Sequence, residues 1–303
     1  MIFVRKIRKY RDVADPAAED IVAQVTRQAD RLASCLAAVR QVVIVASGKG
    51  GVGKSALTAN LAIALADAGY AVGAVDADLN GPSLARMLGA HGQQLQVQDD
   101  ALQPAIGTLG IRLISSDLLL PVRAPLRWRN PAGGPDAGAP AFLFQSVYEG
   151  GVLRELIADV AWGALDFLLV DAPPGTDKLD RLIQLLPTPP VVLLVGTPSQ
   201  AARAVVARSA TVAAESGARE IGLIVNFASH VCEKCGHESP LYEADSAEAL
   251  AAEAGVALWG AVPFDRQLAA ATDRGEPFGR DQAGAPAARA IRAVANQLER
   301  LVS

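Results

Sequence analysis

The sequence predicts an α/β fold, in which a doubly wound, mostly parallel β-sheet carries helices on both faces. Runs of consecutive apolar residues recur along the 303-residue chain, as expected for strands that are buried on both sides. Segments with apolar residues at helical spacing alternate with these runs, which is the order that βαβ units require. A glycine-rich segment at 48–55 directly follows the first apolar run and opens the next helix. The length suffices for one large domain with a sizeable core.

The expected elements follow from these patterns in chain order. Strands are predicted at 42–45, 71–75, 111–115, 166–171, 190–196, 220–226 and 257–262. Helices are predicted at 17–39, 55–68, 83–88, 145–160, 178–186, 200–216, 246–254, 266–273 and 284–302. The chain thus divides into an N-terminal basic segment and helix, 1–40, and an α/β domain, 41–303.

Two stretches interrupt the alternation. Residues 121–140 hold five prolines and three glycines, which predicts an irregular surface insertion. Residues 228–243 separate a strand from the next helix and contain two closely spaced cysteines. Both stretches are expected to be loops.

The composition argues against a nucleic-acid-binding, membrane-spanning or secreted protein. The formal net charge is −4, whereas a general nucleic-acid binder would carry a basic surface. No run approaches the roughly 18 apolar residues that span a bilayer, and the charged N-terminus lacks the apolar segment of a signal peptide. We therefore expect a cytoplasmic protein with no nucleic-acid partner and no stable membrane association.

The strongest motif is a phosphate-binding loop. Residues 48–55 match G-x-x-x-x-G-K-S between a strand and a helix. Its glycines allow backbone N–H groups to point at phosphate oxygens, Lys54 can reach the β and γ phosphates, and the Ser55 hydroxyl can bind magnesium. The residues expected to bind nucleotide here are Gly48, Lys49, Gly50, Gly51, Val52, Gly53, Lys54 and Ser55.

Three aspartates follow strand ends that should lie at the same edge of the sheet as this loop. Asp171 comes after an apolar strand, as the magnesium-holding aspartate of P-loop ATPases does. Asp76 and Asp78 could orient water or metal, although a single aspartate after a strand is often a helix cap. Lys49 could reach the phosphates of a facing protomer and act as an arginine finger does, or it could be a solvated loop lysine.

The chain has three cysteines, too few for a disulfide framework. Cys232 and Cys235 could hold a soft metal centre, but a zinc ion or an iron–sulfur cubane takes four ligands. Either two chains each give a pair, or His230 and His237 complete a zinc site, or the pair is redox-active or inert. Cys35 is expected to be a packed small hydrophobe.

These motifs together resemble a known family. The sequence GKGGVGKS resembles the lysine-bearing P-loop of the MinD, ParA and nitrogenase iron protein class of dimeric ATPases. Over about residues 41–280 the chain is similar to the Mrp-type iron–sulfur carrier ATPases within that class. The segments that carry this similarity are 76–83, 128–131, 171–176 and 232–237.

The resemblance implies a homodimer with Mg²⁺ and ATP at its interface and slow ATP hydrolysis. It also implies a 4Fe–4S cluster that Cys232 and Cys235 of both chains bridge and that is delivered to apo-proteins. By the same resemblance, Lys49 acts across the dimer, Asp78 positions the attacking water and Asn226 contacts the adenine base.

The chain also departs from the family pattern. Asn130 stands where the family usually has glycine, a Pro/Gly-rich insertion follows it, and 171–178 lacks one residue of the usual PPGTGD segment. One rival interpretation is a positioning ATPase of the MinD or ParA kind, which would use a membrane-seeking C-terminal helix. We expect the apolar stripe of 284–302 to dock on the domain instead. A second rival is a P-loop ATPase with a structural zinc site.

Overall fold

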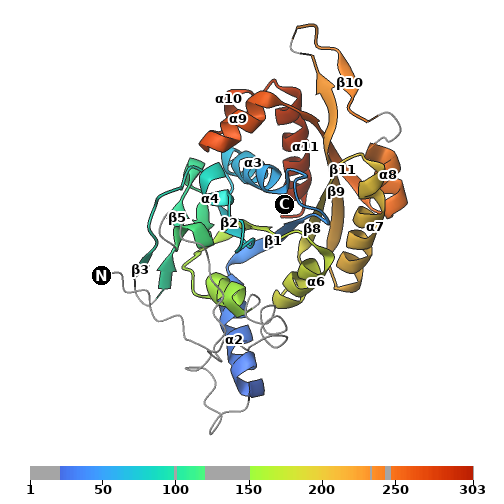
Figure 1. Ribbon diagram of the computed structural model, residues 1–303. Coiled ribbons are helices and arrows are strands. Elements are labelled where there is room, and N and C mark those ends of the chain that lie inside the picture. Colours follow the sequence, from blue (N-terminus) through green and yellow to red (C-terminus); the bar gives the residue numbers. More distant parts are fainter. Residues whose placement is uncertain (1–20, 99–100, 120–150, 233, 243–246, 303) are drawn as a thin grey trace, which may run out of the picture.

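The computed structural model describes residues 21–98, 101–119, 151–232, 234–242 and 247–302. Its main sheet has nine strands in the order β10-β9-β8-β1-β7-β2-β6-β5, with β11 paired to β9 (Figure 1). The parallel strands are β1 (Val39–Ala46), β2 (Val72–Asp76), β6 (Arg112–Ile114), β7 (Leu165–Asp171), β8 (Val191–Gly196), β9 (Glu220–Val231) and β11 (Ala257–Phe264). The antiparallel strands are β5 (Ala105–Ile106) and β10 (Glu238–Pro240).

Helices cover both faces of this sheet, which confirms the predicted doubly wound fold. One face packs against α3 (Lys54–Asp67), α4 (Leu84–Met87), α9 (Arg266–Arg274), α10 (Phe278–Asp281) and α11 (Pro286–Arg300). The other face packs against α2 (Ile21–Leu36), α6 (Thr176–Leu185), α7 (Gln200–Glu215) and α8 (Ala247–Ala254). Residues 151–158 are also helical, within the helix predicted at 145–160.

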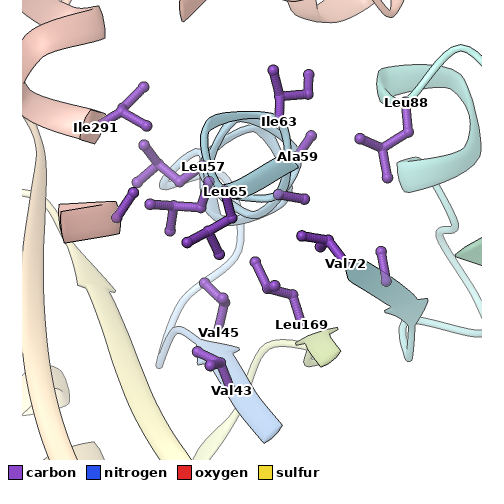
Figure 2. Packing of buried hydrophobic residues seen from close by; sticks show 14 of the residues in the cluster. Val43, Val45, Leu57, Ala59, Ile63, Leu65, Val72, Leu88, Leu169 and Ile291 are labelled. Carbon is purple, nitrogen blue, oxygen red and sulfur yellow. The ribbon is translucent and has the colours of Figure 1, made fainter. Parts of the chain in front are cut away.

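The two cores follow from the period of a strand, whose successive side chains point to opposite faces. On β1, Val43 and Val45 belong to the cluster under α3, whereas Val42 and Ile44 belong to the cluster on the other face. Figure 2 shows Val43 and Val45 pointing toward Leu57 and Leu65 of α3. Because both faces are buried, the strand is apolar at every one of these positions.

The structure corrects the prediction for 228–243. Instead of ending near residue 226, β9 continues to Val231, and the chain returns along it as β10. Part of the expected loop is therefore a β-hairpin that extends beyond the rest of the sheet (Figure 1). The predicted insertion at 121–140, the segment 128–131 and the basic residues near the N-terminus lie outside the described residues.

Several short elements were not predicted. They are β3 (Gln96–Gln98), paired with β4 (Ala101–Gln103), the strand β5, the helix α10, and two 3₁₀ turns, η1 (Thr108–Gly110) and η2 (Ser116–Leu118). Each has two to four residues, too few to show a period.

The C-terminal helix docks on the domain, as predicted. Ile291, Val294 and Leu298 of α11 are buried in the cluster that α3 shares, and Gln297 Nε2 donates a hydrogen bond to the carbonyl oxygen of Trp259 on β11. Throughout the described ranges, no helix combines the length and the apolar character needed to cross a membrane.

Candidate functional site: a phosphate-binding loop and a cysteine hairpin

The loop between β1 and α3 is held from both sides. Asn226 Nδ2, on β9, donates to the carbonyl oxygen of Val52 at 2.9 Å, and Ser47 Oγ donates to that of Lys49 at 2.9 Å. Gly53 has φ of 83°, and a Cβ there would lie 2.3 Å from Asn226 Nδ2. Glycine is therefore required at Gly53, both for its left-handed backbone and for the approach of β9.

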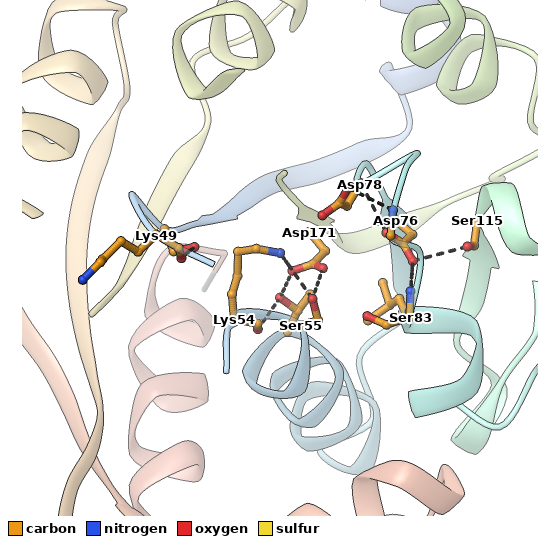
Figure 3. Close-up of polar contacts among 12 residues, drawn as sticks. Lys49, Lys54, Ser55, Asp76, Asp78, Ser83, Ser115 and Asp171 are labelled. Carbon is orange, nitrogen blue, oxygen red and sulfur yellow. Dashed lines mark hydrogen bonds and ion pairs between the residues drawn. The ribbon is translucent and has the colours of Figure 1, made fainter. Parts of the chain in front are cut away.

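Lys54, Ser55 and Asp171 form one polar cluster at the start of α3. Lys54 Nζ lies 2.7 Å from Asp171 Oδ1, and Ser55 Oγ donates to Asp171 Oδ2 at 2.5 Å (Figure 3). Lys54 is 7% exposed and Asp171 is fully buried. A buried ammonium, a hydroxyl and a carboxylate beside a loop of backbone N–H groups can together hold a polyphosphate and a divalent cation. The structure thus brings these three predicted residues together.

Thr58 belongs to this cluster, and the sequence did not indicate it. Its Oγ1 lies 2.8 Å from Asp171 Oδ1 and 3.0 Å from the carbonyl oxygen of Lys54, and the residue is fully buried. A threonine inside a helix carries no distinctive sequence signal. The contact of Thr58 with Asp171 depends on the pairing of β7 with β1, which places Asp171 beside α3.

Asp76 is paired with Asp171 in the register of β2 and β7. Its Oδ2 accepts the backbone N–H groups of Ser83 and Leu84, each at 2.9 Å, and the Ser115 hydroxyl at 3.3 Å. Burial, and next the negative charge of Asp171, raise the pKa of Asp76 to about 7. Asp76 therefore anchors the start of α4 and adds a second carboxyl group to this edge.

Asp78 and Lys49 lie on the solvent side of the site. Asp78 is partly exposed, and its Oδ1 accepts the N–H of Gly81 at 3.2 Å, so it closes its own turn. Lys49 is exposed, and its amine points away from Lys54 and Asp171 (Figure 3). Asp78 is therefore available to a ligand at the sheet edge, and Lys49 to a molecule facing the loop.

The two close cysteines occupy the tip of the β9–β10 hairpin. The N–H of Cys232 donates to the carbonyl oxygen of His237 at 2.9 Å, and the N–H of Gly236 donates to that of Cys232 at 2.9 Å. Gly236 has φ of 70°, which permits this tight turn. Cys235 is exposed and Cys232 is half-buried. The hairpin thus presents both residues near the surface.

The single-chain zinc site is not assembled in the described part of the chain. No three or more His, Cys, Asp and Glu side chains there are grouped closely enough to hold one metal ion, and His230 and His237 are both exposed. Cys35 lies elsewhere, and its thiol donates toward the carbonyl oxygens of Ile157 and Val160, each at 3.3 Å. Burial, and next the charge of Asp159, raise the pKa of Cys35, consistent with the packed role predicted for it.

Comparisons with known proteins agree with this arrangement. Residues 38–299 match the family model described as ParA, NUBPL iron-transfer P-loop NTPase. The chain is 34% identical over 266 residues to a protein of Saccharolobus solfataricus named iron-sulfur cluster carrier protein, covering 87% of this chain and 84% of that one. It is 35% identical over 270 residues to the human cytosolic Fe-S cluster assembly factor NUBP2, covering 87% and 93%.

Solved structures show the same fold. A nucleotide-binding protein from Archaeoglobus fulgidus, in complex with ADP, superposes with a TM-score of 0.68 at 29% identity, covering 86% of this chain and 95% of that one. The cell division ATPase MinD of Pyrococcus furiosus superposes with a TM-score of 0.59 at 23% identity, covering 86% and 99%. With a family model matching most of its length, the chain belongs to the ParA/NUBPL family of iron-transfer P-loop NTPases.

Proposed function

We propose that this chain is an ATP-dependent iron–sulfur carrier, which binds a 4Fe–4S cluster and passes it to apo-proteins. The observation that carries the proposal is the course of β9, which holds Asn226 against the phosphate loop and leads six residues later to Cys232. Six residues of extended chain span at most roughly 20 Å, so nucleotide and cluster would be neighbours. The names of the archaeal and human relatives support the same function.

ATP and Mg²⁺ would occupy the edge of the sheet. The N–H groups of 48–55 and Lys54 would bind the phosphates, Ser55 and Asp171 would hold Mg²⁺, and the Asn226 amide would contact the adenine base. Asp76, beside Asp171, would contribute to the water and metal shell.

Hydrolysis would require two protomers. Lys49 is exposed and points away from its own loop, so it would neutralise the phosphates held by a facing protomer. Asp78 would position the attacking water. A reaction that depends on such a pairing is expected to be slow.

The cluster would likewise bridge two chains. Each chain offers Cys232 and Cys235, and a cubane needs four ligands, so a two-fold axis completes the cage. Two exposed apolar residues near the hairpin could form that contact. Phe264, at the end of β11, pairs with His230, and Leu241 directly follows β10.

Phe264 is 38% exposed and Leu241 is 46% exposed. Cys232 directly follows β9, two residues after the His230 that pairs with Phe264, so it lies close to this apolar contact. An isologous contact through Phe264 and Leu241 would therefore bring two Cys232 residues toward each other. We further infer that 41–303 acts as one ATPase domain after the 1–40 segment, and that the protein works in the cytosol with no nucleic-acid or stable membrane partner.

Metal analysis of the protein reconstituted under anaerobic conditions tests this function. We expect about four iron and four sulfide per two chains, in a dimer measured by light scattering. Mixing the loaded dimer with an apo iron–sulfur enzyme should restore that enzyme's activity. A monomer with one tightly bound zinc would overturn the carrier function and favour a structural zinc site.

A further inference from the structure

Thr58 contacts a buried carboxylate, whereas the hydroxyls of Thr211 and Thr272, on two other helices, do not. A threonine inside a helix commonly donates its hydroxyl to the carbonyl oxygen four residues earlier. Thr211 does so toward Ala207 at 3.2 Å, and Thr272 toward Leu268 at 2.7 Å. Thr58 Oγ1 has the equivalent carbonyl, that of Lys54, at 3.0 Å, and also has Asp171 Oδ1 at 2.8 Å.

The hydroxyl has one hydrogen for these two acceptors. A carboxylate is the stronger acceptor, and the hydrogen bond to it is the shorter of the two. Both residues are fully buried, so water does not compete for the hydrogen. Thr58 therefore donates to Asp171.

Asp171 has two other side-chain partners around its carboxylate. Lys54 Nζ shares Oδ1 with Thr58, and Ser55 Oγ donates to Oδ2. In the proposed function both partners would contact the ligand, because Lys54 would bind the phosphates and Ser55 would bind Mg²⁺. Thr58 lies one turn further along α3, behind the carboxylate. Its hydrogen bond to Asp171 can therefore persist when Lys54 and Ser55 contact the ligand.

We propose that Thr58 is a positioning residue, which keeps the Asp171 carboxylate oriented for Mg²⁺ when Lys54 and Ser55 turn to the nucleotide. Groups that orient a metal-binding side chain from behind typically change metal affinity or activity by about 10- to 100-fold when removed. The inference rests on the proposed nucleotide site and adds to it a residue that touches neither nucleotide nor metal.

The test is Thr58→Val, which keeps the shape of the side chain and removes the hydroxyl. We expect the Mg²⁺ concentration for half-maximal ATP hydrolysis to rise about tenfold or more, with nucleotide binding in chelator unchanged. Thr58→Ser, which restores the hydroxyl, should return the Mg²⁺ requirement close to that of the wild type. Mn²⁺ binding to the protein–nucleotide complex, followed by electron paramagnetic resonance, should weaken in Thr58→Val by a similar factor.

Two other threonines serve as controls. Thr211→Val removes an exposed hydroxyl from α7, and Thr272→Val removes a buried one from α9. Thr272→Val should lower the melting temperature without changing the Mg²⁺ requirement. A Thr58→Val protein that melts lower but keeps the wild-type Mg²⁺ requirement would reduce Thr58 to a packing role and leave the ATPase function intact. A wild-type protein without Mg²⁺-dependent nucleotide binding would overturn the function and this inference together.

Discussion

Asp76 and Asp171 stand side by side at the carboxyl ends of two neighbouring parallel strands, and both are fully buried. The lysine of the phosphate loop pairs with Asp171 at 2.7 Å, whereas the partners of Asp76 are backbone N–H groups and a serine hydroxyl. One of two adjacent carboxyl groups thus has a cation and the other does not. Burial, and next the negative charge of Asp171, raise the pKa of Asp76 to about 7.

This asymmetry predicts a dependence of stability on pH. The folded-state pKa of Asp76, about 7, exceeds the ordinary aspartate value of 3.8, so the folded state binds more protons between these two pH values. Stability therefore falls as pH rises through that window. Asp76→Asn removes this titration. The stability of the variant relative to the wild type should therefore be greater at pH 8 than at pH 5, by a few kcal/mol at most.

Urea unfolding in chelator and without nucleotide measures this difference. Asp166 provides a control of the opposite sign, because the N–H of Ala71 and then Arg40 lower its pKa. The stability that the Asp166 carboxylate contributes is present above its pKa in the unfolded chain. It is lost only as pH falls through its lower pKa in the folded protein. The effect of Asp166→Asn should thus be the same at pH 5 and pH 8. An Asp76→Asn effect that is equally constant would contradict the prediction.

Lys54→Ala should abolish or greatly weaken ATP binding. The change removes the cation that would face the β and γ phosphates and leaves Asp171 buried without its ion-pair partner. Calorimetric titration with ATP and Mg²⁺ measures the affinity, and circular dichroism checks the fold. Lys178→Ala, on α6, is the matched control and should bind as the wild type does. A folded Lys54→Ala protein with an unchanged dissociation constant would refute the assignment of the phosphate site.

Lys49→Ala should separate binding from turnover. Because Lys49 points away from its own loop, nucleotide affinity should be retained, while hydrolysis should fall by about 10³-fold, the scale of an arginine finger. Wild-type hydrolysis per chain should rise with protein concentration as protomers pair. If the variant hydrolyses ATP normally, or if the wild-type rate is independent of concentration, the role across the dimer is wrong.

Asp78→Asn should show the same separation for a different reason. The amide retains a hydrogen-bonding side chain in the turn closed by Gly81 but loses the charge that would orient the attacking water. ATP should bind with near wild-type affinity, and single-turnover hydrolysis should be slow. Equal single-turnover rates for variant and wild type would exclude this role for Asp78.

The sequence predicted most of what positions the nucleotide site. Buried parallel strands are apolar throughout, so the positions of β1, β2, β7 and β8 along the chain could be inferred, and the loop at 48–55 has a fixed pattern. Placing Asp76 and Asp171 at one sheet edge followed from topology alone. Their pairing as direct neighbours did not, because it depends on β7 lying between β1 and β2.

The hairpin and Thr58 show what the sequence could not supply. His230, Ser239 and Pro240 have no strand pattern of their own, and β10 forms because β9 extends far enough to pair with it. Likewise, nothing in the sequence distinguishes Thr58 from the other small residues of its alanine-rich helix. Its role becomes visible only in the tertiary structure, where its hydroxyl contacts Asp171. Both features arise from contacts between segments distant in the chain or from an edge that folding exposes.

The cysteine variants test the cluster itself. Cys232→Ala and Cys235→Ala should each lose the visible absorption and the iron of the reconstituted dimer, because either change leaves the shared cage with two thiolates instead of four. ATP binding should persist, since the phosphate loop is formed by β1, α3 and β9 without the hairpin tip. Iron and sulfide analysis beside ATP titration on the same samples measures both properties.

Cys35→Ala is the matched control, because its thiol is directed at the carbonyl oxygens of Ile157 and Val160 and not at the hairpin. It should retain the full cluster and lose at most some stability. Phe264→Asp should leave both cysteines in place yet weaken the dimer, and the cluster with it, whereas Val97→Asp, at a similarly exposed apolar residue outside the hairpin, should not. If Cys232→Ala keeps its iron, or if Phe264→Asp and Val97→Asp load equally well, the cluster does not bridge two chains through this face.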